Sequence, residues 1–239
     1  MNRNIYLFKS DWKIIGRDPM LILCLIAPIL LLMVALFLLP IVSGITTRMF
    51  NFPIDSYFSI IRLFLFSLTP MMLGMIYGFI LLDDRDGGII SYLAITPIGK
   101  SGYLAVRMLV PVMLSFVTGI IFLILTGFAS LLTGFEMIAL SIIVSTEAPL
   151  MLLFLGAFAS NKVEGIAISK GFGIIMLPML IDYFLKGSWR WALSVSPLWW
   201  VERAVFGDLQ YRWLYLLGAA LVHCFLIFLL YKKFEKRFG

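Results

Sequence analysis

Six long stretches of apolar residues dominate the chain, and short polar segments separate them. They cover residues 20–42, 57–82, 104–132, 137–159, 165–185 and 213–231. A helix rises about 1.5 Å per residue, so each stretch can cross a hydrocarbon core of about 30 Å. The stretches contain prolines, which membrane helices tolerate where neighbouring helices satisfy the freed carbonyl groups: Pro28, Pro70, Pro111, Pro149 and Pro178. The pattern predicts an all-α integral membrane protein with six transmembrane helices.

The segment before the first apolar stretch, residues 1–18, has a mixed pattern. Its apolar side chains Ile5, Phe8, Trp12 and Ile15 recur at spacings of 3, 4 and 3 residues. These spacings place them on one face of a helix, and basic side chains are interspersed among them. We therefore predict an amphipathic helix over residues 1–18 that lies in the membrane interface.

Two connections between the apolar stretches are longer than simple turns. Residues 83–101 form one of them, and residues 186–212 form the other, on the opposite side of the predicted bundle. The second connection carries four of the six tryptophans: Trp189, Trp191, Trp199 and Trp200. Tryptophan prefers the headgroup level of a bilayer. We therefore expect residues 186–212 to lie along the outer interface or to dip into it as a re-entrant segment.

The composition agrees with a single transmembrane domain over residues 1–239. Hydrophobic residues make up 62% of the chain and charged residues 13%, whereas an average soluble domain is about 25% charged. A chain of this kind lacks the polar surface of a water-soluble enzyme. The net charge is +6, which we attribute to basic loops on the cytoplasmic side of a membrane. No nucleic-acid partner is expected.

The basic residues predict the orientation of the chain. If the N-terminus is cytoplasmic, 13 of the 19 lysines and arginines fall on the inner side and six on the outer side. The outer six are Arg48, Arg62, Lys186, Arg190, Arg203 and Arg212. The positive-inside rule then predicts a multi-pass protein of the cell membrane with both termini in the cytoplasm. Arg62 lies near the end of its apolar stretch, where a long side chain can reach the interface.

The chain offers few groups for catalysis or metal binding. His223 is its single histidine, so sites that need two histidine ligands are impossible and no metal site is expected. Residues 94–101 read AITPIGKS, which approaches a phosphate-binding loop, but Ala94 replaces the first glycine and no strand precedes it. We expect no catalytic residue, no nucleotide site and no cofactor in this chain. Any use of ATP would need a second polypeptide.

The connection at residues 83–101 carries the most specific motif. Its order is Asp84-Arg85-Asp86-Gly87-Gly88-Ile89-Ile90, followed by Leu93-Ala94-Ile95-Thr96-Pro97. This order resembles the pattern of ABC-2 type transporter permeases, which is acid-Arg-acid-acid-Gly-Thr-Leu and then a leucine-rich stretch ending in Thr-Pro or Ser-Pro. Gly87 departs from the second acid of that pattern and Ile89 from its threonine. In that family the segment joins the second and third spans and forms a cytoplasmic coupling helix.

The resemblance implies that this coupling helix docks on an ATP-binding cassette subunit. The docking residues would be Asp84, Arg85, Asp86, Gly88, Ile89, Ile90, Leu93, Thr96 and Pro97. Ile89, Leu93 and Pro97 would share one helix face, at positions i, i+4 and i+8. The acids at 83, 84 and 86 are expected at the helix N-terminus, where the helix dipole favours negative charge. Pro97 would end the helix.

A second resemblance to the same family precedes the last span. Ser196-Pro197-Leu198-Trp199-Trp200-Val201-Glu202 is similar to the family segment Asn-Pro-Leu-x-Tyr-x-x-Glu, with serine in place of Asn and tryptophan in place of Tyr. The candidate residues of this outer segment are Pro197, Trp199, Trp200 and Glu202.

Together the resemblances imply the permease subunit of an exporter for a hydrophobic or amphipathic small molecule, drug or peptide antibiotic. The partners would be a separate ATPase subunit that holds ATP and Mg, a second copy or paralogue of the permease, and membrane lipids.

Glu147 lies in the middle of the fourth apolar stretch. An acid there costs about 2.5–3.5 kcal/mol on insertion scales, so it should face the interior of the bundle or a wet cavity. Three interpretations stay open, and the last of them is that the span has a different register along the chain. Glu147 contacts substrate or a proton on a path that includes Met72 and Met75, or it makes a structural hydrogen bond between helices. If Glu147 contacts a proton, the chain has an alternative function as a proton-coupled secondary transporter or channel.

Small residues recur at helix-packing spacing in two stretches. They are Gly74 with Gly78, and Ser169 with Gly173. Such pairs allow helix backbones to approach closely. We expect these faces at the interface of a permease dimer, with the translocation path between its two halves.

Overall fold

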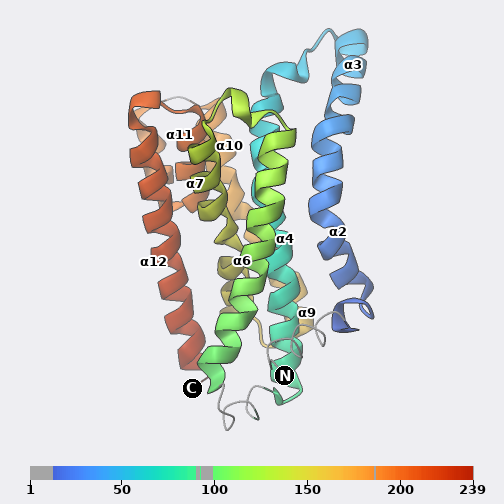
Figure 1. Ribbon diagram of the computed structural model, residues 1–239, viewed down its shortest axis with the longest axis vertical. Coiled ribbons are helices and arrows are strands. Elements are labelled where there is room, and N and C mark those ends of the chain that lie inside the picture. Colours follow the sequence, from blue (N-terminus) through green and yellow to red (C-terminus); the bar gives the residue numbers. More distant parts are fainter. Residues whose placement is uncertain (1–12, 90–91, 93–98, 186, 239) are drawn as a thin grey trace.

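The computed structural model describes residues 13–89, 92, 99–185 and 187–238, and every regular element in these ranges is helical. The described chain has six segments long and apolar enough to cross a membrane: Pro19–Phe50, Ile54–Asp86, Gly102–Leu125, Gly134–Phe158, Lys162–Phe184 and Leu209–Arg237. The segments run side by side as a bundle (Figure 1). The predicted fold class and the predicted number of spans are confirmed.

Several spans consist of more than one helical segment. The first contains α2 (Pro19–Met33), a π-helical segment (Val34–Leu38) and α3 (Leu39–Phe50). The second is α4 (Phe58–Asp86), after a 3-10 turn at Ile54–Tyr57, and the third is α6 (Gly99–Leu125). The fourth contains α7 (Gly134–Ser145) and α8 (Glu147–Phe158). The fifth contains α9 (Lys162–Phe172), a 3-10 segment (Gly173–Met176) and α10 (Leu177–Phe184). The elements η5 (Ser188–Val195), α11 (Pro197–Phe206) and η6 (Leu209–Tyr211) lead to α12 (Arg212–Phe238).

α4 is the central helix of the bundle. In its most apolar part 89% of the residues are buried, whereas the share is 28% or less in the first, third, fifth and sixth spans. Its glycines let α8 approach closely. A Cβ atom on Gly74 would lie 2.3 Å from the Ala148 carbonyl oxygen, and one on Gly78 would lie 2.7 Å from the Leu155 side chain. This face is therefore used within the chain, and it is not open for the dimer contact that we expected. Gly173 has open space around its Cβ position.

Proline accounts for the interruption of the fourth span. Pro149 has no N–H to donate to the Ser145 carbonyl, and its ring clashes with that carbonyl in a regular helix. α7 accordingly ends at Ser145, and α8 begins at Glu147 after the junction residue Thr146. The Thr146 hydroxyl donates to the Ile143 carbonyl oxygen. The interruption places Glu147 in the first turn of α8, in the middle of the span.

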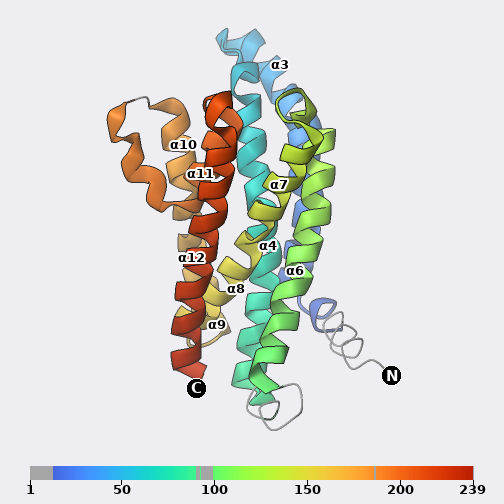
Figure 2. The same ribbon diagram turned by 60° about the vertical axis from the view of Figure 1, so that its left-hand side comes forward.

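Both described ends of the chain lie at one end of the bundle (Figures 1 and 2). Of the predicted interfacial helix, residues 1–12 lie outside the described residues. The part that follows has Ile15 buried and Lys13 exposed, as the amphipathic pattern predicts. Which end of the bundle faces the cytoplasm stays a prediction.

η5 and α11 form a hairpin beside α10 and α12 (Figure 2). The turn of this hairpin reaches the middle of the bundle. There the Ser196 hydroxyl donates to the Ile175 carbonyl oxygen at 3.0 Å, and Pro197 lines a small apolar cavity with Leu150 and Leu226. The hairpin therefore extends along the bundle and not across its end. Its depth in a bilayer stays a prediction.

Candidate functional site

A buried polar cluster joins the end of α4 to the start of α6. Asp84 is 5% exposed and Arg107 is 4% exposed. The Arg107 Nη2 atom donates to Asp84 Oδ2 at 2.6 Å, and Arg107 Nε donates to the Tyr103 hydroxyl oxygen at 3.1 Å. That hydroxyl donates in turn to Asp84 Oδ2. The cluster therefore fixes the two helices that carry the predicted coupling segment.

A chain of ion pairs lies at the same end of the bundle. The Lys162 ammonium group donates to Asp83 at 2.7 Å and to Asp18 at 2.8 Å, which connects α9 with α4 and with the start of α2. The bond from Lys162 holds the pKa of the Asp18 carboxyl below its usual value. Arg85 donates to the Ala159 carbonyl oxygen at 2.9 Å. These contacts involve the loop between α8 and α9 as well as the start of the predicted coupling segment.

The predicted docking residues fall into separate groups. Asp84 is buried inside the chain, so it holds α6 against α4 and does not present its carboxylate on the surface. Asp86, Gly88 and Ile89 are exposed, and Gly88 has φ +71°, a conformation that favours glycine. Arg85 is mostly buried. Ile90, Leu93, Thr96 and Pro97 lie outside the described residues.

The expected position of the acids is wrong. Residues 83, 84 and 86 end α4, which continues through Asp86, and they do not begin a new helix. The interaction with the helix dipole is therefore unfavourable there, and basic partners compensate for it. Those partners are Lys162 for Asp83 and Arg107 for Asp84. The exposed tip beyond α4 presents Ile89, 46% exposed, and Tyr92, 69% exposed.

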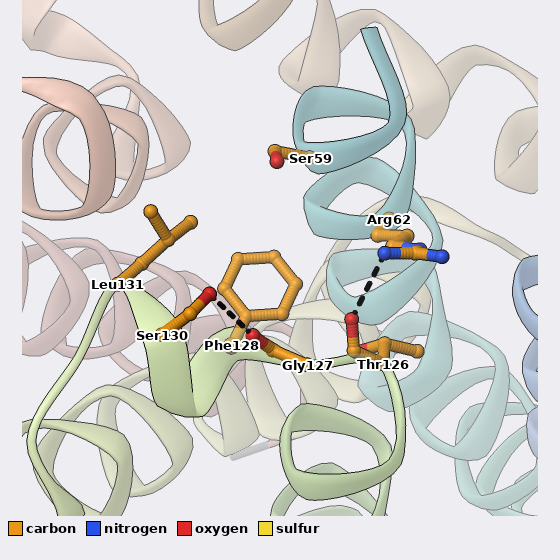
Figure 3. A pocket seen from close by; sticks show the side chains of 7 residues that line it. All are labelled: Ser59, Arg62, Thr126, Gly127, Phe128, Ser130 and Leu131. Atoms are coloured by element: carbon orange, nitrogen blue, oxygen red, sulfur yellow. Dashed lines mark hydrogen bonds between the residues drawn. The ribbon is translucent and has the colours of Figure 1, made fainter. Parts of the chain in front are cut away.

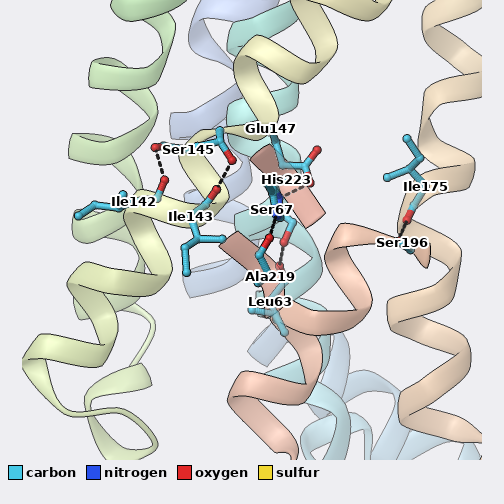
Figure 4. Close-up of polar contacts among 11 residues, drawn as sticks. Leu63, Ser67, Ile142, Ile143, Ser145, Glu147, Ile175, Ser196, Ala219 and His223 are labelled. Atoms are coloured by element: carbon cyan, nitrogen blue, oxygen red, sulfur yellow. Dashed lines mark hydrogen bonds and ion pairs between the residues drawn. The ribbon is translucent and has the colours of Figure 1, made fainter. Parts of the chain in front are cut away.

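Glu147 pairs with His223 inside the bundle (Figure 4). The two side chains are 0% and 1% exposed, and Glu147 Oε1 lies 2.9 Å from His223 Nε2. His223 Nδ1 lies 2.7 Å from the Ala219 carbonyl oxygen, so Nδ1 carries a hydrogen and donates it. One further proton then lies between Nε2 and Oε1, either on the acid or on the imidazole ring. The second carboxyl oxygen of Glu147 is buried and has no partner in the described chain.

The structure does not connect the two candidate methionines with this pair. Met72 and Met75 are half-buried on α4, and Met75 packs against the hydrophobic core. A different methionine, Met108 on α6, lines an apolar groove of about 420 Å³ between α6, α8 and α12. The groove also includes Pro149 and Tyr231. Its volume falls in the range of pockets that bind drug-sized molecules, about 300–1,000 Å³.

Charged side chains also meet at the opposite end of the bundle. Asp182 of α10 is fully buried, and Arg190 of η5 donates to it from Nη2 at 2.7 Å. Arg203 of α11 lies 3.8 Å from the same carboxylate. Burial, together with the neighbouring Asp182 carboxyl, raises the pKa of Glu202 to about 9. Glu202 is therefore neutral at pH 7, and the cluster fastens the hairpin to α10.

The other candidates of the outer segment also hold the hairpin in place. Trp199 is 1% exposed and Pro197 is buried. The Trp200 indole N–H donates to the Ser194 carbonyl oxygen at 2.8 Å. Its ring fits over Gly218 of α12, where a Cβ atom would lie 2.3 Å from it. Asp182 and Arg190 were not predicted as site residues, and Arg190 was named only among the outer basic residues. Their opposite charges eight residues apart are the signal that was available.

Comparison with known proteins identifies the family. The model of the family described as Rv2686c-like, fluoroquinolones export permease protein Rv2686c-like, matches residues 11–231. The fluoroquinolones export permease protein Rv2686c of Mycobacterium tuberculosis (strain ATCC 25618 / H37Rv) is 26% identical over 234 residues, which cover 96% of this chain and 92% of that protein. Protein MT2760 of strain CDC 1551 / Oshkosh, which has the same description, matches equally well. No solved structure matches the chain significantly. The chain belongs to the Rv2686c-like family of fluoroquinolones export permease proteins.

Proposed function

We propose that this chain is the membrane subunit of an ATP-driven exporter that moves amphipathic aromatic drugs, with fluoroquinolones as the first candidates, out of the cell. The family match over residues 11–231 carries the proposal. The two relatives are described as fluoroquinolones export permeases and align along nearly their whole length. In this proposal the chain binds no nucleotide. A separate ATPase subunit holds ATP and Mg, and a second permease completes the membrane part.

The connection between α4 and α6 is the proposed contact for the ATPase subunit. Ile89 and Tyr92 are exposed there, and exposed apolar side chains on a connection outside the spans suit a protein contact. Directly behind them, the Asp84–Arg107 pair joins α4 rigidly to α6. A force on the loop would therefore move both helices together. Arg85 and Lys162 extend the connection to the α8–α9 loop and to α2.

Two substitutions on the exposed tip test this contact. Ile89→Asp and Tyr92→Asp put a charge into the proposed apolar contact without disturbing a buried residue. We expect each variant to insert and fold normally and to lose co-purification with the ATPase subunit. Leu209→Asp is the matched control, because Leu209 is 70% exposed near the opposite end. Normal co-purification and transport in both tip variants would contradict the proposed contact.

The apolar groove between α6, α8 and α12 is the proposed site of first contact with the drug. It offers apolar walls and the adaptable Met108 side chain. Ala105 lines the groove and is exposed, so Ala105→Phe should fill space there without disturbing the core. We expect this variant to raise the KM for drug transport. Val117→Phe adds the same bulk to an exposed position of α6 outside the groove and should leave the KM unchanged.

A proton-coupled transporter is the second candidate function. The Glu147–His223 pair favours it, because a buried acid and imidazole that share one proton are suited to proton exchange. The two functions differ in their energy source. Drug export by the first requires ATP and survives the collapse of the proton gradient, whereas export by the second requires that gradient. The complete burial of both side chains favours a structural role in the conformation described here.

A further inference from the structure

A polar pocket lies between the first turn of α4 and the connection from α6 to α7 (Figure 3). Its volume is about 130 Å³. Ser59 and Arg62 of α4 form one side, and residues 126–128 with 130–131 form the other. Gly127 turns the chain with φ +83°, which brings the connection against α4. No lining residue of this pocket carries a carboxylate.

Arg62 is the only charged group of the pocket lining, and no carboxylate of the described residues pairs with it. Its Nη1 atom donates to the Thr126 carbonyl oxygen at 3.0 Å, and its guanidinium carbon lies 5.2 Å from the centre of the Phe58 ring. Its Nε atom is buried without a hydrogen-bond partner. Arg107, Arg190 and Arg212 each pair with a carboxylate of the described chain, and Arg62 does not. The side chain therefore contacts the α6–α7 connection through Nη1, and most of its donors have no partner among the described residues.

The position of the pocket indicates which anion is available to it. Phe58 begins α4 and Leu125 ends α6, so the pocket lies where two spans leave the hydrocarbon core. Phospholipid phosphates are concentrated at that depth. The Ser130 hydroxyl donates to the Gly127 carbonyl oxygen at 2.8 Å and the Thr126 hydroxyl to the Phe122 carbonyl oxygen. Arg62 and the Ser59 hydroxyl are therefore the side-chain donors that remain in the lining. Phe128 and Leu131 supply apolar surface beside them, as a glycerolipid requires.

We propose that this pocket binds the phosphate group of a phospholipid, with the Arg62 guanidinium as its main donor. Guanidinium groups bind phosphate through two parallel N–H bonds, and the unused donors of Arg62 permit this geometry. The bound phosphate would compensate a charge that otherwise remains partly desolvated. It would also hold the α6–α7 connection against α4. The site lies at the opposite end of the bundle from the proposed ATPase contact, so it is independent of that contact.

The test uses the full-length chain in lipid nanodiscs, with retained lipid counted by native mass spectrometry after detergent transfer. The probes are phosphatidylglycerol, diacylglycerol as a phosphate-free lipid, and inorganic phosphate. We expect Arg62→Gln to retain about fivefold less phosphatidylglycerol than the wild type. Arg48→Gln removes an equal charge from an exposed position at the same end and should retain the wild-type amount. Diacylglycerol retention should be the same in all variants.

A second variant separates binding from folding. Ser59→Phe fills the pocket and leaves Arg62 and its bond to Thr126 in place, and it should lose phosphatidylglycerol to a similar extent. Equal retention in Arg62→Gln and Arg48→Gln, or wild-type retention in Ser59→Phe, would overturn the proposal. Displacement of the lipid by millimolar inorganic phosphate would also overturn it, because the site would then belong to a soluble anion.

Discussion

The buried Asp84–Arg107 pair allows a direct test of how the α4–α6 connection is built. In Asp84→Asn the neutral amide keeps the size of the side chain and removes the charge opposite Arg107, 2.6 Å away. The two side chains are 7% and 5% exposed, so solvent does little to replace the lost interaction. Breaking a buried pair of this kind costs about 3–5 kcal/mol, because one charge stays behind in a low-dielectric site.

The matched control is Asp86→Asn, which removes the same charge two residues away. The Asp86 side chain is 43% exposed and its contact with Arg85 is 3.4 Å long, and exposed pairs contribute about 0–1 kcal/mol. Thermal unfolding of the purified chain, followed by fluorescence-detected gel filtration, should show a Tm for Asp84→Asn several degrees below that of Asp86→Asn. Equal Tm values would refute the structural role. If Asp84→Asn instead kept its Tm and lost only the ATPase subunit, Asp84 would be a docking residue, as the sequence first indicated.

Three further predictions concern other parts of the bundle. Glu147→Gln should fold in normal amounts, because its amide can donate to His223 Nε2. Glu147→Leu leaves that nitrogen unpaired, so it should lower the free energy of unfolding by about 1–3 kcal/mol and reduce the yield of folded protein; equal yields of the two variants would remove the structural role. Gly74→Leu should destabilise the chain severely, since its Cβ atom would lie 2.3 Å from the Ala148 carbonyl oxygen. Gly173→Ala should leave the Tm unchanged, because the Cβ position of Gly173 has open space around it. A wild-type Tm for Gly74→Leu would contradict the α4–α8 packing. Glu202 binds its proton more tightly in the folded state, so its contribution to stability should fall as pH rises from about 4.5 towards 9. The Tm of the wild type should therefore decrease over this pH range, and Glu202→Gln should remove that decrease. An unchanged decrease in the variant would show that Glu202 is not the titrating group.

The spans could be predicted from the sequence because hydrophobic length alone specifies them. Each apolar stretch became a membrane-length segment, and Pro149 explains the interruption of the fourth one. The small-residue pair Gly74 and Gly78 correctly predicted a close helix approach. Spacing identifies a face of a helix but not what covers it, and here α8 of the same chain covers it.

The polar contacts could not be predicted because their partners are distant in the sequence. Glu147 and His223 are 76 residues apart, and Asp84 and Arg107 are 23 apart. The local reading of residues 83–86 favoured the start of a helix, since acids are stabilised there. Basic groups from α6 and α9 reverse that preference and let α4 continue to Asp86. Only the assembled bundle shows which charges meet.

In the proposed function, this chain exports a drug with energy from ATP bound to another subunit. The most direct measurement is uptake of a fluorescent fluoroquinolone into inside-out vesicles that contain the chain and its ATPase partner. We predict uptake that begins on addition of ATP, continues after the proton gradient is collapsed, and disappears in Ile89→Asp. Uptake that needs the proton gradient, proceeds without ATP and is lost in Glu147→Gln would contradict this account and identify a proton-coupled transporter.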